Sequence, residues 1–228
     1  MKKSFPKVVL YNAVSLDGRF EQFPVDMGLF YSLISQWKED ATLAGCDTLL
    51  NAYPPELVKK EGKEAFEPPK RNPKDTRPLL IIPDSRGRLR NWHLLRKEPY
   101  WRDVVALCSK RTPKKYLEYL KKRNIDYLIA GDDYVDFQKA LKELKKRYGI
   151  KTVRVNSGGI LNGVLLRAGL VDEMSLLLHP YLVGGITPKS IYRAPDLSSP
   201  NGVIKTKLIA CKKLNNGILW LRYKVVKE

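Results

Sequence analysis

The sequence predicts an α/β fold in which a mostly parallel sheet is flanked by helices and carries an antiparallel edge. Strand-length apolar runs alternate with amphipathic helical patterns through the first three quarters of the 228-residue chain. The run at 7–15 is almost continuously apolar, as expected of a strand that is buried on both faces. The last quarter holds two further runs, 203–214 and 218–226, and Asn215-Asn216-Gly217 between them is a strong signal for a hairpin.

The first forty residues predict one strand and one helix joined by a turn. The apolar run "KVVLYNAVS", at 7–15, has the length and composition of a strand. Asp17 and Gly18 then form a turn dipeptide. In "DMGLFYSLISQWKED", at 26–40, apolar residues recur at helical spacing, which predicts a helix.

The next segment predicts a second strand and a surface excursion. "ATLAGCDTLL", at 41–50, predicts a strand that ends in a glycine-containing turn, and then a short helix that begins near Asp47 or Thr48. From 51 to 76 the composition changes to Pro, Lys and Glu without periodicity, which indicates a long insertion or flap. No linker rich in Pro, Gly or Ser divides the chain, so we expect a single domain over 1–228.

Strands and helices alternate through the middle of the chain. Four further strands are predicted, at 78–82, 103–109, 125–131 and 151–157. Three helices lie among and after them, at 114–124, 134–147 and 160–169. Thr112 and Pro113 suit the N-cap and first position of the first of these helices, and Gly149 and Gly169 stand where the C-caps of the other two belong.

The chain is strongly basic, with a formal net charge of +18, so polyanion binding has to be considered. The lysines of "KKYLEYLKKRN" and "KALKELKKRYG", however, fall on the polar faces of two amphipathic helices beside glutamates, which is typical of a solvated face. No recognition-helix, RNA-binding or zinc motif accompanies them, so a nucleic-acid-binding protein is the weaker alternative. Phosphate-bearing small molecules, or a surface adapted to heat, are the other uses of this charge.

Other classes of protein are disfavoured by composition. No apolar run reaches the roughly 18 residues of a membrane span, and no signal-peptide pattern is present, so we expect a cytoplasmic protein. Cys46, Cys108 and Cys211 are too far apart in sequence for a zinc or disulfide framework, and we interpret them as small buried hydrophobic residues. With only His93 and His179 besides, we expect no metal site.

Two loops that follow strands have the composition of phosphate sites. Asn156-Ser157-Gly158-Gly159 opens a helix, so the N–H groups of Gly158, Gly159 and Ile160 could hold a diphosphate, although a tight strand-to-helix turn is the alternative. Asp84-Ser85-Arg86-Gly87-Arg88 offers two guanidinium groups and a hydroxyl, which suit a phosphomonoester such as the 2′-phosphate of NADP. A solvated basic turn is the alternative for this second loop.

Two further positions are candidates with structural alternatives. Ser15-Leu16-Asp17-Gly18 ends the first strand, where Asp17 either orients a polar substrate or only forms the turn. Thr48 either offers its hydroxyl to a cofactor or caps the short helix. Trp37, Trp92 and Trp101 are interpreted as core residues.

At this point four segments resemble a known family: "AVSLDGRF", "AGCDTLL", "RPLLIIPDSRGRL" and "NSGGILNGVLLRAGLVDEMSLLLHPYLVGG". Together they resemble the reductase domain of riboflavin biosynthesis, the 2,5-diamino-6-ribosylamino-pyrimidinone 5′-phosphate reductase family, over essentially the whole chain. The resemblance implies a dihydrofolate reductase-like fold, NADPH as cofactor, a homodimer, and hydride transfer from nicotinamide C4 to ribosyl C1′. Without the deaminase domain, the chain looks like the free-standing type.

The resemblance also implies roles for individual residues. Thr48 would contact the nicotinamide or its ribose, and Ser85 with Arg86 or Arg88 would hold the 2′-phosphate. The diphosphate would lie against five consecutive residues, Ser157, Gly158, Gly159, Ile160 and Leu161. The substrate would contact the turn from Ser15 to Asp17, and also Asn156 and Lys59. Asp17 is the one acid in these motifs that could assist proton delivery, and the flap at 51–76 would close over the substrate with Lys59 or Lys60 on its phosphate.

Three departures from the family pattern all touch the substrate side. The usual "TVLADDP" is "TLLNAYP" here, which places Asn51 and Ala52 where an acid is expected. Asn156 replaces a glutamate before the glycine loop, and "ELVKK" replaces "LTVR". These departures favour, as the alternative, an NADPH-dependent reductase of another pyrimidine, a pterin or a small carbonyl compound.

Overall fold

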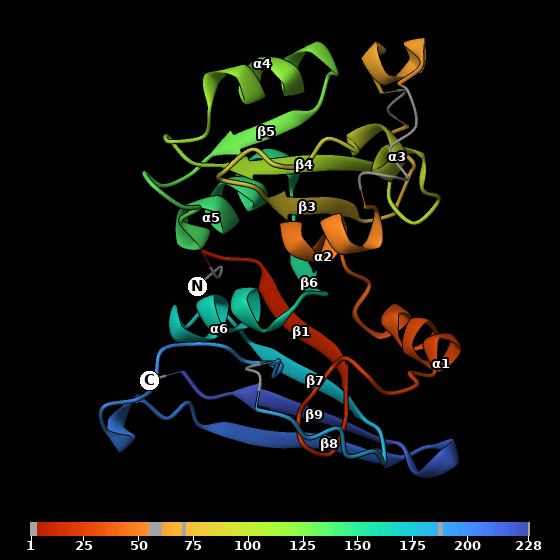
Figure 1. The fold of residues 1–228 in the computed structure, drawn as a ribbon, viewed down its shortest axis with the longest axis vertical. Helices are drawn as coiled ribbons and strands as arrows, with labels where there is room; N and C mark the ends of the chain where they lie inside the picture. Colours follow the sequence, from red (N-terminus) through yellow and green to blue (C-terminus); the bar gives the residue numbers. More distant parts are fainter. Residues whose placement is uncertain (1–3, 55–60, 70–71, 187–188, 228) are drawn as a thin grey trace. The chain divides into compact units, whose positions relative to one another are not determined.

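The computed structural model describes residues 4–54, 61–69, 72–186 and 189–227, and its ribbon is drawn in Figure 1. The chain separates into two compact units, each assembled from segments far apart in sequence. The first unit holds Glu39–Val153 with the N-terminal residues up to Pro6, and the second holds Lys7–Lys38 with Arg154–Glu228. The single domain expected from the sequence stays a prediction.

The first unit contains four parallel strands in the order β5-β4-β3-β2. Their bounds are Ala41–Leu43 for β2, Leu79–Pro83 for β3, Asp103–Cys108 for β4 and Asp126–Ile129 for β5. All four strands were predicted from apolar runs. Nearly every residue of β3 and β4 is buried, which confirms that these strands are covered on both faces.

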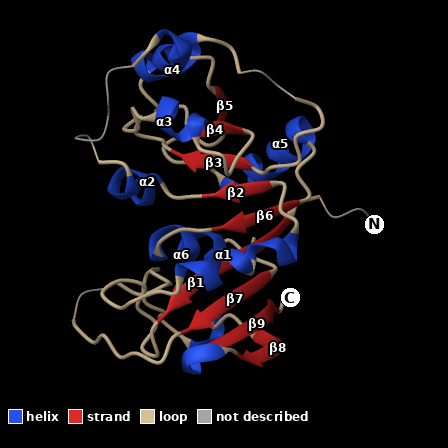
Figure 2. Cartoon of the chain, turned by 90° about the vertical axis from the view of Figure 1, so that its right-hand side faces the viewer, coloured by secondary structure: helices blue, strands red, loops and turns tan. Residues whose placement is uncertain are grey.

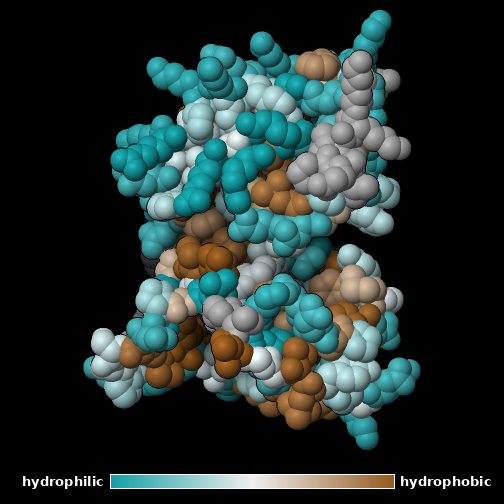
Figure 3. All heavy atoms as spheres, viewed as in Figure 1, coloured by the Kyte–Doolittle hydropathy of each residue, from teal (hydrophilic) through white to brown (hydrophobic). Residues whose placement is uncertain are grey.

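Helices cover this sheet, and Figure 2 shows them in blue around the red strands. They are α2 (Cys46–Ala52), α3 (Trp92–Lys97), α4 (Lys114–Lys122) and α5 (Phe137–Tyr148), with a 3-10 helix at Lys63–Phe66. On α4 and α5 the apolar stripe is buried while most lysines are exposed, and the hydrophilic surface over α4 is visible in Figure 3. This pattern confirms the prediction of solvated lysine faces.

Two local predictions for this unit were wrong, and one short helix was not predicted. Pro113, not Thr112, occupies the N-cap of α4, and the Thr112 hydroxyl instead accepts from Ser109 N at 2.9 Å. The helix α2 begins at Cys46, before the predicted start. The short helix α3 was not predicted at all; it is held in place by burial of Trp92, His93 and Leu95.

The second unit contains four whole strands, in the order β1-β7-β9-β8. β1 (Lys7–Val14) and β7 (Glu173–Leu178) are parallel, while β9 (Leu219–Val225) is antiparallel to both β7 and β8 (Thr206–Lys213). The chain enters this unit through β6 (Thr152–Val155), and its helices are α1 (Met27–Ser32) and α6 (Gly159–Arg167). The predicted α/β class, with mostly parallel strands and an antiparallel C-terminal hairpin, is confirmed.

The helix predicted over 26–40 is shorter than its apolar spacing suggested. Asp26 caps α1, which ends at Ser32, and a 3-10 helix follows at Ile34–Trp37. The chain then turns at Lys38, whose φ of 44° is left-handed. A tighter final turn keeps the apolar side chains on one face, so Phe30 and Trp37 still pack on Tyr11 of β1.

Most of the tryptophans and cysteines that the sequence analysis interpreted as core residues are buried. Trp37 and Trp92 are buried, and Trp101 is partly buried against the core of the first unit. Cys46 and Cys108 are buried, as expected, but Cys211 on β8 is exposed, so its interpretation as a buried residue was wrong. Within the described ranges, no helix combines the length and apolar character that crossing a membrane requires.

The acids of the "GLVDE" segment hold the second unit together at one end of its strands. Asp172 accepts from the Val8 N–H at 2.9 Å. Glu173 is almost fully buried and accepts from Lys7 at 2.7 Å, Trp37 at 3.1 Å and Arg222 at 2.7 Å. Burial opposes ionisation, but these donors outweigh it and hold the pKa of Glu173 below its ordinary value.

Two glycines of α6 allow the segment 190–193 to cross the helix at close range. A Cβ added to Gly163 would lie 2.0 Å from the carbonyl oxygen of Arg193, and a Cβ on Gly159 would lie 2.2 Å from that of Ser190. A hydrogen bond joins the segment to the helix: the Arg193 N–H donates to the Gly159 carbonyl at 2.9 Å. Side chains at these two positions are therefore excluded by backbone, which cannot easily give way.

We expect Gly163→Ala to destabilise the protein by about 1–3 kcal/mol, because the overpacking against Arg193 exceeds the helix preference of alanine. Chemical denaturation measures the change. Val164→Ala on the same helix is the control, since Val164 is 45% exposed and its truncation should change stability by less than about 0.5 kcal/mol. A Gly163→Ala variant as stable as the wild type would contradict the close approach.

Candidate functional site

In the first unit, the loop after β3 is shaped by one buried carboxylate. Asp84 is 2% exposed and accepts from the N–H groups of Arg88 at 3.0 Å and Leu89 at 2.9 Å, and from the Tyr116 hydroxyl at 2.8 Å. Gly87 turns the loop with a φ of 63°, and its N–H donates to the Asp84 carbonyl. This acid therefore fixes the backbone from which the two predicted arginines project.

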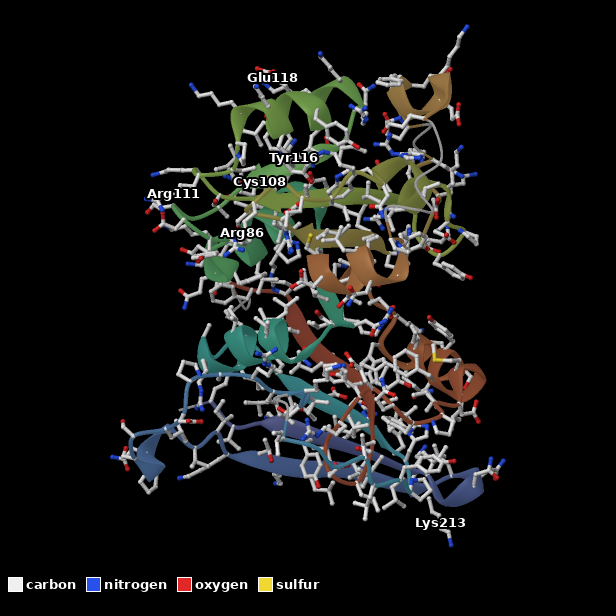
Figure 4. The ribbon with its side chains drawn as sticks, in the orientation of Figure 1. Arg86, Cys108, Arg111, Tyr116, Glu118 and Lys213 are labelled. Carbon is white, nitrogen blue, oxygen red and sulfur yellow. The ribbon has the colours of Figure 1, made fainter. Side chains whose placement is uncertain are left out.

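The two arginines of this loop differ in what they bind. The Arg88 guanidinium forms an ion pair with Asp47 in the first turn of α2, at 2.6 Å. Arg86 is exposed, and no residue in the described part of the chain pairs with it. Figure 4 labels Arg86 and Arg111 at the end of the unit where β3 and β4 finish, and Arg111 is paired with Asp133 at 2.8 Å. Arg86 is therefore the cation of this loop that is available to an anion.

Ser85 and Thr48 lie near these arginines: Ser85 precedes Arg86 in sequence, and Thr48 follows the Asp47 that pairs with Arg88. The Ser85 hydroxyl oxygen accepts from the Val135 N–H at 3.1 Å, which leaves its O–H free to donate. Thr48 is exposed in the first turn of α2, next to the Asp47 that holds Arg88. Gly45 occupies the N-cap of α2, so the alternative role of Thr48 as the cap is wrong.

In the second unit, the turn after β1 encloses Ser15 and presents Asp17. Ser15 is fully buried; its hydroxyl donates to Asp17 Oδ1 at 2.5 Å and accepts from the Arg19 N–H at 3.0 Å. Gly18 has a φ of 73°, as its place in the turn requires. Asp17 also accepts from the N–H of Gly184 at 2.7 Å, so it ties this turn to the loop after β7. The buried Ser15 side chain therefore stabilises the turn through these hydrogen bonds.

These donors decide the charge of Asp17. Hydrogen bonds from the Ser15 hydroxyl and the Gly184 N–H lower the pKa of Asp17 to about 2. Near neutral pH the carboxyl group is therefore ionised and has no proton to give. Asp17 is suited to accept a hydrogen bond, and delivery of a proton needs another source.

The two glycines at the start of α6 have different surroundings. Gly158 is the N-cap, and a Cβ on it would meet only the Phe20 ring, at 3.5 Å. Gly159 is the first helical residue, and its bare backbone is occupied by the segment 190–193. The packing alternative therefore explains Gly159, while the open side of the loop lies at Gly158.

The first turn of α6 offers donors to a ligand. The N–H groups of Gly159, Ile160 and Leu161 have no intrahelical acceptor, as at any helix start, and the helix dipole favours negative charge there. Ile160 is exposed and Leu161 is buried, so they contribute backbone more readily than side chains. Asn156, half-buried, stands just before this turn.

Sequence reasoning missed three residues that surround the glycine loop. Asn12 and Asn162 are buried amides whose hydrogen bonds meet at the Ser157 carbonyl oxygen. Arg193 is exposed, and its Cγ would lie 3.0 Å from a Cβ on Gly159, so its stem crosses the start of α6. A polar Asn162 among the apolar residues of a helix was the available signal for part of this arrangement.

The predicted flap is described only in part. Lys59 and Lys60 lie outside the described residues. Farther along, Glu61 forms an ion pair with Arg123, Glu64 pairs with Lys97 at 2.6 Å, and the Phe66 carbonyl accepts from Asn124 at 2.7 Å. The described part from 61 to 66 is therefore attached to α3 and to the end of α4.

The donors in both loops are suited to anions. The first unit offers an unpaired guanidinium and hydroxyl groups, and the second offers backbone N–H groups at a helix start. Among the residues that the structure describes, no group of three or more His, Cys, Asp or Glu side chains could hold a metal ion. The residues present in each loop therefore fit a phosphate group of a phosphate-bearing cofactor.

Comparisons with known proteins agree with the resemblance seen in the sequence. The model of the RibD C-terminal domain family matches residues 6–220. The chain is 28% identical over 194 residues to the 2,5-diamino-6-ribosylamino-4(3H)-pyrimidinone 5′-phosphate reductase of Aquifex aeolicus, which covers 79% of each chain. It is 29% identical over 188 residues to the protein of the same name in Archaeoglobus fulgidus, over 79% of this chain and 83% of that one.

Solved structures share the fold. A pyrimidine reductase-like protein of Corynebacterium diphtheriae has a TM-score of 0.73 at 16% identity, over 98% of this chain and 93% of that chain. The riboflavin biosynthesis reductase Rib7 of Saccharomyces cerevisiae has a TM-score of 0.65 at 20% identity, over 99% and 92%. RibD of Acinetobacter baumannii has a TM-score of 0.71 at 22% identity, and this chain spans 59% of its length.

We expect Ser15→Ala to raise the pKa of Asp17, because the Ser15 hydroxyl is the largest influence that lowers it. A carbon-13 NMR titration of the Asp17 carboxyl group measures the midpoint, which should be near 2 in the wild type. This pKa is below the ordinary 3.8. The stability that the hydrogen bonds to Asp17 contribute is therefore complete above about pH 4 and declines as the pH falls toward 2.

Ser35→Ala serves as the control for this titration, because the Ser35 hydroxyl donates to the carbonyl of Ser32, away from the hydrogen bonds that hold Asp17. It should leave the midpoint of Asp17 unchanged. A wild-type midpoint near 3.8 would show that the hydrogen bonds from Ser15 and Gly184 do not lower the pKa of Asp17.

Proposed function

The chain belongs to the RibD C-terminal domain family, and from this premise we propose that it is an NADPH-dependent reductase of riboflavin biosynthesis. Its substrate is 2,5-diamino-6-ribosylamino-4(3H)-pyrimidinone 5′-phosphate, the compound in the names of its relatives. Reduction at ribose C1′ converts the ribosylamino group to a ribitylamino group. The observation that carries this proposal is the family match from residue 6 to 220.

The anion-binding loops support NADPH as the cofactor. We assign the adenosine 2′-phosphate to Arg86 and the Ser85 hydroxyl, since Arg86 is exposed and without an ion pair in the described ranges. The diphosphate is assigned to Ser157 and the N–H groups from Gly158 to Leu161. Arg88, paired with Asp47, orients the first turn of α2, where Thr48 is assigned to the nicotinamide ribose. When bound, NADPH supplies the hydride.

The remaining residues are assigned to orienting the substrate. Asp17 is ionised near neutral pH and accepts a hydrogen bond from a substrate hydroxyl or amine. The Asn156 amide offers one acceptor and a pair of donors beside the glycine loop. Lys59 is assigned to the substrate phosphate from the family resemblance alone. The protein's contribution to rate is therefore mainly orientation of the two reactants, with solvent as the proton source.

A second candidate is reduction of another pyrimidine, a pterin or a small carbonyl compound by the same cofactor. The departures from the family pattern favour it, because Asn51, Ala52 and Asn156 stand where acids are usual. Asn51 and Ala52 lie in the exposed last turn of α2. Neutral residues there would suit a substrate with fewer cationic or donor groups.

Assembly and location are extensions of the same proposal. We extend the proposal to a homodimer, which the family resemblance implies, and to a cytoplasmic location; sedimentation of the purified protein would give its mass directly. A dedicated nucleic-acid partner is not part of the proposal, because the lysines of α4 and α5 lie on solvated faces.

The proposal is tested by binding and then by turnover. The purified protein is titrated with NADPH and with NADH by fluorescence, and the ribosylaminopyrimidine phosphate is then added while NADPH oxidation is followed. We expect selective NADPH binding and a product heavier by one pair of hydrogen atoms in mass spectrometry. NADPH binding without turnover would favour the second candidate, and binding of neither nucleotide would refute both.

We expect Arg86→Gln to weaken NADPH binding by about tenfold or more and to leave NADH binding unchanged, because only NADPH carries the 2′-phosphate. Arg77→Gln is a matched control: Arg77 precedes β3, whereas Arg86 follows it, and it is paired with Asp75 at 2.6 Å. Equal losses in the two variants, or an equal loss for both nucleotides, would show that Arg86 does not read the 2′-phosphate.

A further inference from the structure

Two buried amides converge on one carbonyl group of the glycine loop. Asn12, on β1, donates from Nδ2 to the Ser157 carbonyl oxygen at 3.0 Å. Asn162, on α6, directs its own Nδ2 toward the same oxygen at 3.5 Å and donates to Asn12 Oδ1 at 3.0 Å. Asn12 is 5% exposed and Asn162 is completely buried, so both sets of hydrogen bonds are made away from solvent.

The surroundings fix the orientation of the Asn162 amide. Its Nδ2 faces the carbonyl oxygens of Ser157 and Ile191, the latter at 3.0 Å. A backbone carbonyl only accepts, so the nitrogen and not the oxygen must face these groups. Oδ1 of Asn162 is left buried without a partner among the described residues. The two N–H groups of this amide therefore point to Asn12 Oδ1 and the Ile191 carbonyl, both at 3.0 Å, and the Ser157 carbonyl is a longer third contact at 3.5 Å.

The orientation of one peptide group follows from these bonds. In a trans peptide the C=O and the N–H point to opposite sides, so a Ser157 carbonyl held toward the two amides turns the Gly158 N–H away from them. Gly158 is the N-cap of α6, on the open side of the loop. With the amides absent, rotation of this peptide would present a carbonyl oxygen at the helix start and repel an anion.

We infer that Asn162, with Asn12, is the positioning residue that sets the Ser157–Gly158 peptide so that the start of α6 presents only N–H groups to the cofactor diphosphate. The inference rests on the proposed function. Asn162 touches neither cofactor nor substrate; it acts through the backbone that it holds. Its bond to the Ile191 carbonyl also holds the segment whose Arg193 crosses the start of α6.

The test is the variant Asn162→Asp, which keeps the shape of the side chain and removes the N–H donors at pH 8. We expect the Kd for NADPH to rise about tenfold or more, the size expected for a lost hydrogen bond to a buried carbonyl. Adenosine 2′-phosphate, which has no diphosphate, should bind as it does to the wild type. In the free variant, hydrogen exchange of the backbone at 157–161 should be faster.

Ser175→Ala is the matched control for a general loss of stability. Ser175 is also completely buried in the second unit, where its hydroxyl accepts from Trp220 Nε1 at 2.8 Å. It should lower the Tm and leave the Kd for NADPH unchanged. If Asn162→Asp fails to fold, Asn12→Ser is used instead, because its shorter hydroxyl cannot reach the Ser157 carbonyl from β1.

An unchanged Kd for NADPH in the folded variant would overturn the inference, and so would equal losses for NADPH and adenosine 2′-phosphate. The wild-type titration separates this failure from failure of the proposed function. If the wild type binds NADPH and the variant binds it equally well, only the positioning role is lost. If the wild type binds no NADPH, the proposed function falls and the inference falls with it.

Discussion

The conformation between β6 and α6 depends on the hydrogen bond from Asn12 to the Ser157 carbonyl, and on the Asn162 amide that holds Asn12 and also approaches this carbonyl. They join β1, the glycine loop and the segment at Ile191 into one buried polar cluster. Burying these amide and carbonyl groups without hydrogen-bond partners would destabilise the fold. The cluster therefore specifies one arrangement of the loop, and Gly159 completes it by admitting the crossing segment at backbone distance.

Charge is used locally in this protein, although its net value is +18. Most lysines of α4 and α5 lie on solvated faces, where they keep the surface polar. Within one loop, Arg88 is committed to Asp47 while Arg86 is exposed and unpaired in the described ranges. Asp17, the acid of the turn after β1, is held ionised by its own donors. In the proposed reaction these side chains bind and orient the reactants, and the hydride comes from the cofactor.

The strands and their order along the chain could be predicted because buried parallel strands have continuous apolar runs. Helix ends were less predictable: Thr112 looks like an N-cap, but its hydroxyl is used by Ser109. The glycine pair was found from its pattern, yet the reason for Gly159 depends on Ser190 and Arg193, about thirty residues away. Asn12 was missed because one polar residue in an apolar strand gives no sign of its partner.

The most direct test of this account is a crystal structure of the protein with NADP⁺ bound. The account predicts diphosphate oxygens within hydrogen-bond distance of the N–H groups at the start of α6, the Ser157 carbonyl still turned to Asn12 and Asn162, and the 2′-phosphate beside Arg86. A diphosphate bound away from α6, or a Ser157 carbonyl rotated toward the phosphates, would contradict it.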